Sequence, residues 1–455
     1  MERKIYSDLL AWKESDSRLP LILMGARQIG KTYTITEFLK GEAKKYLAFN
    51  LFDRPDICAL FAEPIRPEEK LRRLALLEGG AIDFARTVIF FDEVQHSEDI
   101  IAALKFFAEA DVPYKIICAG SLLGVKLNRF SKPFPVGKVE MLRMYPMDFE
   151  EYLWAAGCAA LAEEIRACFA KNRAMSAPLH EKCLNLYRAY LCCGGMPEAA
   201  ANIIKNDHDV LRFNGKILTD IRLAYLADMT KYVQSKAESA KIEAVYNSIP
   251  AQLGNRSSKF QYGEVRRGAR SRDYASALDW LVSSGMVYLC DAVSAPRMPL
   301  RGYVRDGFFK MFLNDPGMLC NALGIRLPEI MLDRDFYYKG VITENYAASQ
   351  LAAAGVPLFY WKGDNAQEID FLIDTPQGVI PVEVKSGKNK ASAGLGSFCR
   401  TFGCSYSLKV RKGNFGFVNN VRNIPLYALF CLGPDRGAEA ARRSFKGHTL
   451  KSKSP

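Results

Sequence analysis

Leu-Ile-Leu-Met-Gly-Ala-Arg-Gln-Ile-Gly-Lys-Thr, at residues 21–32, is the stretch of sequence that decides the fold. Its first four residues are apolar and predict a short strand, whereas residues 33–40 predict a helix. Glycines between a strand and a helix allow the backbone N–H groups to surround a phosphate at the helix N-terminus. The predicted phosphate-binding residues are Gly25, Ala26, Arg27, Gln28, Ile29, Gly30, Lys31 and Thr32.

The last two residues of this loop predict the identity of the ligand. The ammonium group of Lys31 is placed to reach the β and γ phosphates, and the hydroxyl of Thr32 is an oxygen ligand of the kind that magnesium prefers. The sequence therefore predicts a site for ATP with magnesium.

Two further apolar strands end in polar residues that suit the same site. Residues 87–91 run into Asp92 and Glu93, so we expect Asp92 to hold magnesium and Glu93 to orient or deprotonate the attacking water. Residues 114–119 run into Gly120 and Ser121, and Ser121 is a candidate sensor of the nucleotide state. A simple strand-to-loop turn is the alternative interpretation of Gly120 and Ser121.

Four motifs, in this order along the chain, give a resemblance to a known family. They lie at residues 27–32, 91–95, 119–121 and 145–152, the last reading Tyr-Pro-Met-Asp-Phe-Glu-Glu-Tyr. Together they resemble the AAA+ ATPases of bacteria and archaea that carry a nuclease-like C-terminal domain, with a core similar to the STAND and archaeal ATPases. Members of that family usually have an arginine where this chain has Gly137-Lys138, which leaves Arg129 and Arg143 as arginine-finger candidates.

The resemblance covers residues 1 to about 435 and implies an α/β chain of several domains. We expect a P-loop AAA+ core with a parallel sheet at residues 1–150, a helical lid at 151–235, a winged-helix-like domain at 236–325 and a PD-(D/E)XK nuclease-like domain, with a restriction-endonuclease-like α/β fold, at 326–435. Residues 436–455 are polar and basic without apolar periodicity, and we expect a disordered tail.

The expected lid contains a short element that is similar to one in related ATPases. Residues 150–170 and 182–191 have helical spacing, and Cys-Gly-Gly-Met-Pro-Glu at residues 193–198 lies between helices. The resemblance implies that Gly195 and Pro197 approach the adenine. Without it, the same residues read as a turn that begins a helix with proline near its first position.

Residues 240–292 have the element order of a winged helix. Helices are predicted at 242–253 and 271–284 and a strand at 286–289. Basic residues gather between them, with Phe260 and Tyr262 interleaved: Arg256, Lys259, Arg266, Arg267, Arg270 and Arg272. Such a patch could neutralise the phosphates of DNA, but winged helices also dock proteins, and a basic solvated surface is common.

The C-terminal part has a pattern of acids and a lysine on two predicted strands, at residues 368–374 and 379–385. Asp370, Glu383 and Lys385 match the D…E-x-K pattern of restriction-endonuclease-like folds, and Glu383 and Lys385 share one face of their strand. In an active enzyme of that type Asp370 and Glu383 hold magnesium and Lys385 stabilises charge, with Glu344 as a further acid. The alternative is a nuclease-like fold that does not cut.

Composition sets limits on the function. The 455 residues carry a net charge of +12. This charge could attract polyanions such as nucleic acid, and the alternative is a basic surface without such a partner. No stretch of about 18 apolar residues and no secretory signal occurs, so we expect a cytoplasmic protein without a membrane partner. Twelve cysteines without a C-x-x-C pair, and four histidines, argue against a zinc site.

The leading hypothesis is a switch or motor that hydrolyses ATP and acts on the C-terminal domain. One alternative is a metal-dependent DNA nuclease licensed by ATP. Another is a DNA- or protein-binding regulator that holds ATP as a structural ligand. The expected partners are ATP, DNA through the winged helix and C-terminal domain, and a second copy of the chain.

Overall fold

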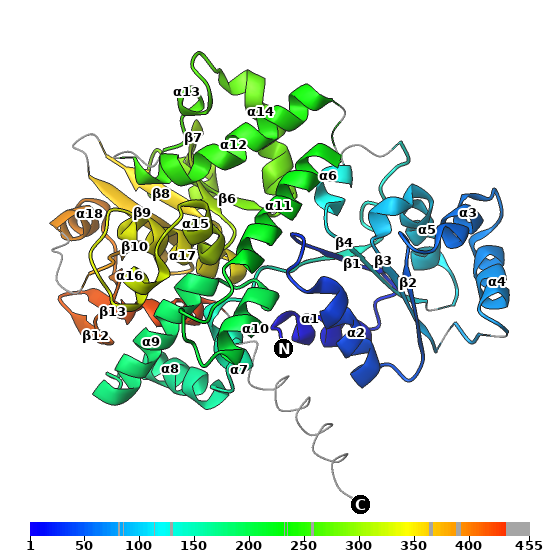
Figure 1. The fold of residues 1–455 in the computed structure, drawn as a ribbon, viewed down its shortest axis with the longest axis horizontal. Coiled ribbons are helices and arrows are strands. Elements are labelled where there is room, and N and C mark those ends of the chain that lie inside the picture. The colour runs from blue at the N-terminus through cyan, green and yellow to red at the C-terminus, as the bar shows by residue number, and fades with distance from the viewer. Residues whose placement is uncertain are drawn as a thin grey trace, which may run out of the picture. The chain divides into compact units, whose positions relative to one another are not determined.

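Five short strands in residues 2–145 form one sheet, in which every pair of neighbours runs parallel. The strand order is β2-β3-β4-β1-β5 (Figure 1). The strands are β1 (Leu21–Met24), β2 (Tyr46–Asn50), β3 (Val88–Asp92), β4 (Lys115–Gly120) and β5 (Glu140–Arg143). This arrangement confirms the parallel α/β core expected from the sequence.

The structure is a computed structural model that describes residues 1–80, 82–84, 86–112, 114–127, 131–231, 233, 235–255, 259–363, 367–387 and 393–433. Arg129, Arg256 and the expected tail at residues 436–455 lie outside the described residues. The chain divides into two units, residues 2–145 and residues 146–435.

Helices cover the five-stranded sheet because its central strands, β1, β3 and β4, are apolar on both faces. Side chains of α3, α4 and α5 pack with Ile89, Phe91 and Ile116 in one buried cluster. The helices of this unit are α1 (Ile5–Glu14), α2 (Lys31–Glu42), α3 (Pro55–Ala62), α4 (Pro67–Leu77), η1 (Val94–His96), α5 (Glu98–Glu109) and α6 (Leu123–Leu127).

The second unit begins with helices. Asp148 caps the first of them and exchanges hydrogen bonds with Glu151, which accounts for two residues of the Tyr-Pro-Met-Asp-Phe-Glu-Glu-Tyr motif. The helix expected over residues 150–170 is interrupted at Gly157, whose φ is +70°. The helices are α7 (Phe149–Ala155), α8 (Ala159–Lys171), α9 (Ala177–Cys193), α10 (Pro197–Lys205) and α11 (Lys216–Lys231).

An eight-stranded mixed sheet, in the order β12-β13-β11-β10-β9-β8-β6-β7, forms the centre of this unit. The strands are β6 (Val287–Val293), β7 (Val304–Leu313), β8 (Phe359–Lys362), β9 (Glu368–Thr375), β10 (Gly378–Val384), β11 (Ser407–Arg411), β12 (Gly416–Val418) and β13 (Val421–Pro425). The accompanying helices are α12 (Lys236–Gly254), α13 (Tyr262–Val265), α14 (Ser271–Ser283), η2 (Leu300–Tyr303), α15 (Pro316–Ala322), α16 (Leu327–Met331), α17 (Lys339–Ala353), α18 (Ala393–Phe402) and η3 (Leu426–Leu432).

The strand predicted at residues 286–289 corresponds to β6, which belongs to this sheet. β6 and β7 form an antiparallel pair, and β6 also pairs parallel with β8. The boundary expected between residues 325 and 326 therefore runs through a unit whose strands are hydrogen-bonded to one another.

The C-terminal elements follow the order helix, three-strand meander, helix, strand. α17 precedes β8, β9 and β10, which pair antiparallel in sequence, and β11 returns after α18 to lie parallel to β10. No helix in the described part of the chain has the length and apolar character needed to span a membrane.

Candidate functional site

The phosphate-binding loop leaves β1 and enters α2 through two glycines in conformations that other residues rarely adopt. Gly25 has φ of +149°, and a Cβ there would lie 2.4 Å from the carbonyl oxygen of Met144. Gly30 has φ of +90° and precedes the first helical residue, Lys31. The loop thus depends on glycine at both ends, as the sequence predicts.

The remaining loop residues divide into buried and exposed side chains. Ala26 and Ile29 are buried, whereas Arg27 and Gln28 point to solvent, with Gln28 at φ of +63°. The apolar side chains therefore anchor the loop.

Two basic side chains bind carbonyl groups of this loop. Lys31 Nζ donates to the carbonyl oxygens of Gly25 at 2.9 Å and Ala26 at 2.7 Å. Arg3 donates to the carbonyl of Ile29 at 2.7 Å and to that of Tyr145 at 2.6 Å. Arg3 was not among the residues that the sequence predicts, because nothing in a motif joins the N-terminus to residue 145.

Thr32 and Asp92 meet at the carboxyl edge of the sheet. The hydroxyl of Thr32 donates to Asp92 Oδ2 at 2.7 Å. Burial raises the pKa of Asp92, while the hydrogen bond from Thr32 and the ammonium of Lys31 act in the opposite direction. Both groups are the oxygen donors that suit magnesium, so the residues present fit that ion.

Glu93 follows Asp92 in a left-handed backbone conformation, with φ of 52° and ψ of 40°. Gln95 donates from its side-chain amide to Glu93 Oε2 and thereby holds the carboxylate. A Cβ on Gly120 would lie 2.4 Å from Gln95 Oε1, so Gly120 leaves room for this pair. The sequence singles out Gly120 as a turn residue and does not predict its contact with Gln95.

The parallel register brings other predicted residues to the same edge. Met24, directly before the loop, pairs with Gly120 of β4 and with Arg143 of β5. Ser121 is buried just beyond Gly120, and Arg143 is exposed. The edge therefore gathers the loop, Asp92, Glu93 and Ser121, all within residues 2–145.

A second cluster of charged side chains lies in the other unit, around Lys310 of β7. Only 1% of this side chain is exposed, and Nζ lies 2.8 Å from Glu344 Oε1 and 2.6 Å from Glu368 Oε1. Burial opposes the charge, but the two carboxylates outweigh it and raise the pKa of Lys310 well above its ordinary value. Lys310 also lies over the ring of Tyr360 at 4.9 Å.

The predicted acids and lysine of the C-terminal pattern lie beside Lys310. Asp370 Oδ2 accepts from the backbone N–H of Val384 at 2.7 Å, and Lys385 Nζ lies 2.6 Å from Glu383 Oε1. Burial, with Glu344 adding to it, raises the pKa of Asp370 to about 7. The other oxygen of Glu383 is buried without a hydrogen-bond partner in the part of the chain that the structure describes.

The donor set of this cluster does not favour a metal ion. Lys310 pairs with two carboxylates and Lys385 with a third. Within the described ranges, no three His, Cys, Asp or Glu side chains are arranged to hold a metal. Magnesium binding by Asp370 and Glu383 stays a prediction.

Gly195 and Pro197 lie at the start of α10. The N–H of Gly195 donates to Asp315 Oδ2 at 2.5 Å, and its carbonyl accepts from Met147 N–H at 2.7 Å. A Cβ on Gly195 would lie 2.0 Å from the Met147 carbonyl oxygen, which is sufficient reason for glycine here. Pro197 occupies the first turn of α10.

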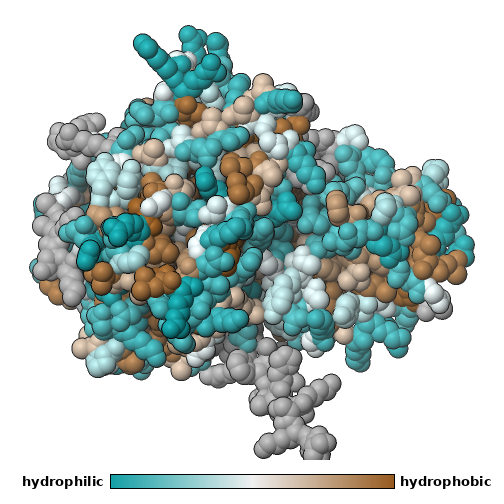
Figure 2. All heavy atoms as spheres, in the orientation of Figure 1, coloured by the Kyte–Doolittle hydropathy of each residue, from teal (hydrophilic) through white to brown (hydrophobic). Residues whose placement is uncertain are grey.

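The basic segment expected to contact DNA is divided between the surface and the interior. Arg266, Arg267, Arg270 and Arg272 are exposed near α13 and α14, where Figure 2 shows hydrophilic side chains. Phe260 is buried and stacks on Phe309 with centroids 5.5 Å apart. Phe260 therefore belongs to the core and does not interleave exposed cations.

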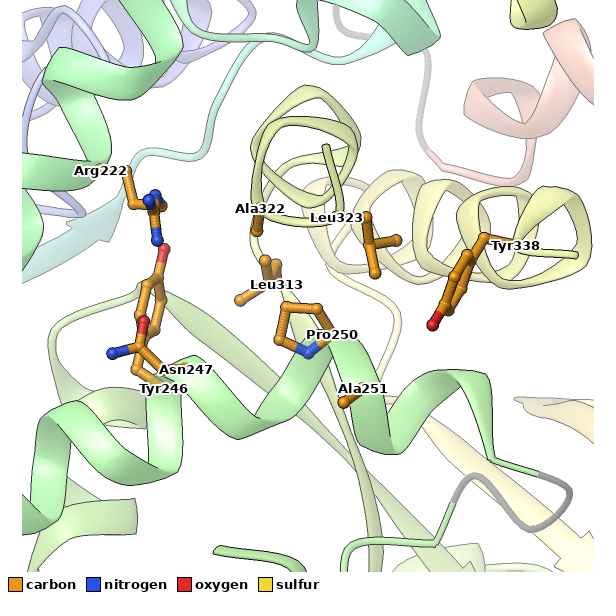
Figure 3. A pocket seen from close by; sticks show the side chains of 9 residues that line it. All are labelled: Arg222, Tyr246, Asn247, Pro250, Ala251, Leu313, Ala322, Leu323 and Tyr338. Carbon is orange, nitrogen blue, oxygen red and sulfur yellow. The ribbon is translucent and has the colours of Figure 1, made fainter. Parts of the chain in front are cut away.

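One pocket of the second unit has a single cation in its lining. It holds about 240 Å³, and Figure 3 shows the guanidinium of Arg222 directed toward the hydroxyl of Tyr246. Pro250 lies within α12 here and has no N–H to donate to the carbonyl of Tyr246. No sequence motif predicts this pocket.

Three family models match separate parts of the chain. A model described as an AAA domain matches residues 17–153. Two models described as domains of unknown function, DUF8612 and DUF4143, match residues 184–329 and 339–429. No curated protein matches the sequence.

Several solved structures are distantly similar. A Walker-type ATPase of Pyrococcus abyssi has 14% identity and a TM-score of 0.43, over 71% of this chain and 95% of that one. The ORC2 protein of Aeropyrum pernix has 12% identity and a TM-score of 0.33, over 76% and 93%. The RuvB Holliday junction branch migration motor of Thermotoga maritima has 14% identity and a TM-score of 0.28, over 63% and 89%.

The match to the AAA domain agrees with the geometry of the loop and of Asp92. The chain contains an AAA-type P-loop domain that binds ATP.

Proposed function

We propose that this chain hydrolyses ATP at the loop of residues 25–32 and that the bound nucleotide acts as a switch or motor for the second unit. The hydrogen bond of 2.7 Å between Thr32 and Asp92, with Glu93 next in the chain, carries this proposal. A site that only stored ATP would have no need of an acid beside the magnesium ligands.

Each residue of the edge has a role in the proposed reaction. Magnesium, when bound, would neutralise charge on the β and γ phosphates, held by Thr32 and Asp92. Lys31 exchanges its hydrogen bonds with the loop carbonyls for bonds with phosphate oxygens. Glu93 orients or deprotonates the attacking water, and Ser121 contacts the γ phosphate.

Gln95 is a positioning residue in this proposal. Its hydrogen bond restrains the Glu93 carboxylate, so the acid reaches a water molecule only from the orientation that Gln95 permits. Gly195 and Pro197 remain proposed adenine contacts from the family resemblance. Arg143 remains a proposed arginine finger.

Phosphate release and nucleotide binding, measured side by side, test hydrolysis. We expect Glu93→Gln to keep ATP affinity while turnover falls by about 10²–10⁴-fold. Lys31→Ala should lose both ATP binding and turnover. Glu37→Gln, which alters an exposed pair with Lys40 on α2, is the matched control and should change neither. Turnover by Glu93→Gln at the wild-type rate would contradict the proposed role of the acid.

A metal-dependent nuclease is the second candidate function for residues 326–435. The grouping of Asp370 on β9, Glu383 on β10, Lys385 directly after β10 and Glu344 on α17 supports it. The order of elements from α17 to β11 supports it as well. The pairing of Lys310 with Glu344, one of these carboxylates, and with Glu368 argues against it.

Cleavage of plasmid and linear DNA with magnesium, in the presence and absence of ATP, separates the two candidates. If the cluster cuts DNA, Asp370→Ala and Lys385→Ala lose cleavage while ATP turnover persists. If wild-type protein turns over ATP and leaves both DNA forms intact, the nuclease candidate is wrong and the ATPase proposal is unaffected.

A further inference from the structure

A pocket of about 270 Å³ lies in the second unit. Most of its lining residues lie on β6, β7, β8 and β9, which belong to one sheet (Figure 1). Its lining includes Lys259, Arg305, Phe308, Tyr360, Lys362 and Glu368. The volume is close to the lower limit of pockets that hold small ligands, roughly 300 Å³. All of these side chains lie outside the ATP site.

A β-bulge positions two of the lining residues. Asp291 pairs with Phe309 and Val293 pairs with Val304, so Ala292 alone faces Arg305, Asp306, Gly307 and Phe308. Gly307 makes this excursion possible, with φ of +72°. Bulges redirect side chains away from the regular ladder and are common beside functional sites. Here Arg305 and Phe308 are directed into the pocket lining, and Asp306 is not part of it.

The pocket is cationic. Lys259, Arg305 and Lys362 line it with one carboxylate, that of Glu368. Glu368 is already paired with buried Lys310 at 2.6 Å and with Lys362 at 3.6 Å. Lys259 and Arg305 have no carboxylate partner among the residues that the structure describes. Burial, followed by the charges of Arg305 and Lys362, lowers the pKa of Lys259.

An aromatic ring holds the two unpaired cations in place. Lys259 Nζ lies 3.5 Å and the guanidinium carbon of Arg305 lies 4.5 Å from the centroid of Phe308. Phe308 itself is 37% exposed, although it is a large apolar side chain. Aromatic rings beside basic side chains are the combination on which nucleic-acid bases stack while their phosphates are neutralised.

We propose that this pocket binds the phosphate of a nucleotide unit, carried by a single nucleic-acid strand or by a free nucleotide, through Lys259, Arg305 and Lys362, with the base against the part of Phe308 that the two cations leave exposed. The proposal gives a location to the nucleic-acid partner suggested above and depends on neither ATP hydrolysis nor DNA cleavage. Through Glu368 the pocket is joined to Lys310, and Asp370 follows on the same strand.

Fluorescence anisotropy with a labelled oligothymidylate of about 12 nucleotides tests the strand, and calorimetry with thymidine monophosphate or inorganic phosphate tests the free ligand. The full chain is used throughout. In Lys259→Glu/Arg305→Glu we expect affinity to fall at least about tenfold. The slope of log affinity against log salt should decrease by about 0.7 for each lost phosphate contact. Phe308→Ala should weaken the oligonucleotide more than it weakens inorganic phosphate.

Lys182→Glu/Lys205→Glu is the matched control, because it makes the same change of charge at exposed positions on α9 and α10. Lys259→Gln/Arg305→Gln, with thermal melting of every variant, separates loss of binding from loss of folding. Each titration is repeated with Lys31→Ala, which is expected to lose ATP binding. Binding to the pocket can then be measured whether or not the proposed ATPase activity exists.

Loss of oligonucleotide binding confined to the pocket variants supports a strand as ligand. If the pocket variants lose binding of thymidine monophosphate but not of the oligonucleotide, the ligand is a free nucleotide. The proposal is overturned if the wild type binds none of the probes, or if folded pocket variants and the matched control bind them equally.

Discussion

The hydroxyl of Thr32 donates to Oδ2 of Asp92 at 2.7 Å, across 60 residues of chain. The two residues stand at the ends of different elements, the first turn of α2 and the last position of β3. Because β1 and β3 belong to one parallel sheet, their carboxyl ends point to the same edge. The nucleotide site is thus assembled by the topology of the sheet.

Replacing Thr32 with valine removes the hydroxyl and keeps the shape of the side chain. We expect Thr32→Val to bind ATP without magnesium as the wild type does, but to need at least about tenfold more magnesium for turnover, since metal ligands and their partners contribute on that scale. Phosphate release titrated with magnesium measures it. Thr36→Val, on the same helix, is the control, and equal magnesium dependence in both variants would contradict the role of Thr32.

Gly25→Ala tests the loop conformation. The new Cβ meets the Met144 carbonyl at 2.4 Å, and φ of +149° strains any other residue, so we expect a loss of about 1–3 kcal/mol in the free energy of unfolding of residues 2–145 together with loss of ATP binding. Denaturant titration and nucleotide binding measure the two effects. Gly41→Ala, in α2, meets only the Tyr6 hydroxyl at 3.3 Å, so neither a loss of stability nor a loss of ATP binding is expected there.

Lys310→Met tests the buried charge. Glu344 and Glu368 then lose their shared cation, and we expect the free energy of unfolding at pH 7 to fall by roughly 3 kcal/mol. The carboxylates of the variant take up protons more readily in the folded chain, so the deficit should shrink as the pH is lowered toward 5. Lys216→Met breaks an exposed pair with Asp220 and should cost less than about 1 kcal/mol. Equal stability of both variants at pH 7 would show that Lys310 is not needed to neutralise the acids.

Asp370 predicts a pH dependence of stability in the wild type. Its folded pKa of about 7 exceeds the ordinary value of 3.8, because burial and Glu344 disfavour the charge. The folded chain therefore holds the proton longer, and this contribution to stability is complete below about pH 4 and is lost as the pH rises through 7. The slope reaches at most about 1.4 kcal/mol per pH unit.

Denaturant titrations between pH 4 and pH 8 check this behaviour by comparing wild type with Asp370→Asn, which should lack the slope. Asp315, whose pKa burial raises to about 6, is present in both proteins and cancels in the difference. Asp374→Asn, on the same strand, controls for the amide itself. Parallel curves for wild type and Asp370→Asn would rule out the titration of Asp370.

The nucleotide site could be predicted from the sequence because each of its parts is local. An apolar run followed by Gly25, or by Asp92, predicts both a strand and the functional residue that follows it. A parallel sheet then brings the carboxyl ends of these strands to one edge. Arg3 could not be found in this way, since its contact with Tyr145 spans 142 residues and no pattern connects them.

The second unit was harder to predict because its decisive contacts are long-range. The strands at residues 368–374 and 379–385 are recognisable from their apolar residues, and they agree with β9 and β10. Lys310, by contrast, looks like a solvent-facing residue of its strand until β6, β8 and α17 are placed beside it. The pairing of β6 with β8 likewise has no local signature.

The pairing of β6 with β8 has a consequence for how these two parts of the chain evolve. The matches to the two families of unknown function stop and start between residues 329 and 339, yet β6 of the first stretch is hydrogen-bonded to β8 of the second. A gene rearrangement that separated the two stretches would leave the edge of β8 without a neighbour and open to aggregation. We therefore expect proteins that contain the second stretch to contain the first as well. Where the second stretch occurs alone, we expect another strand to pair with β8.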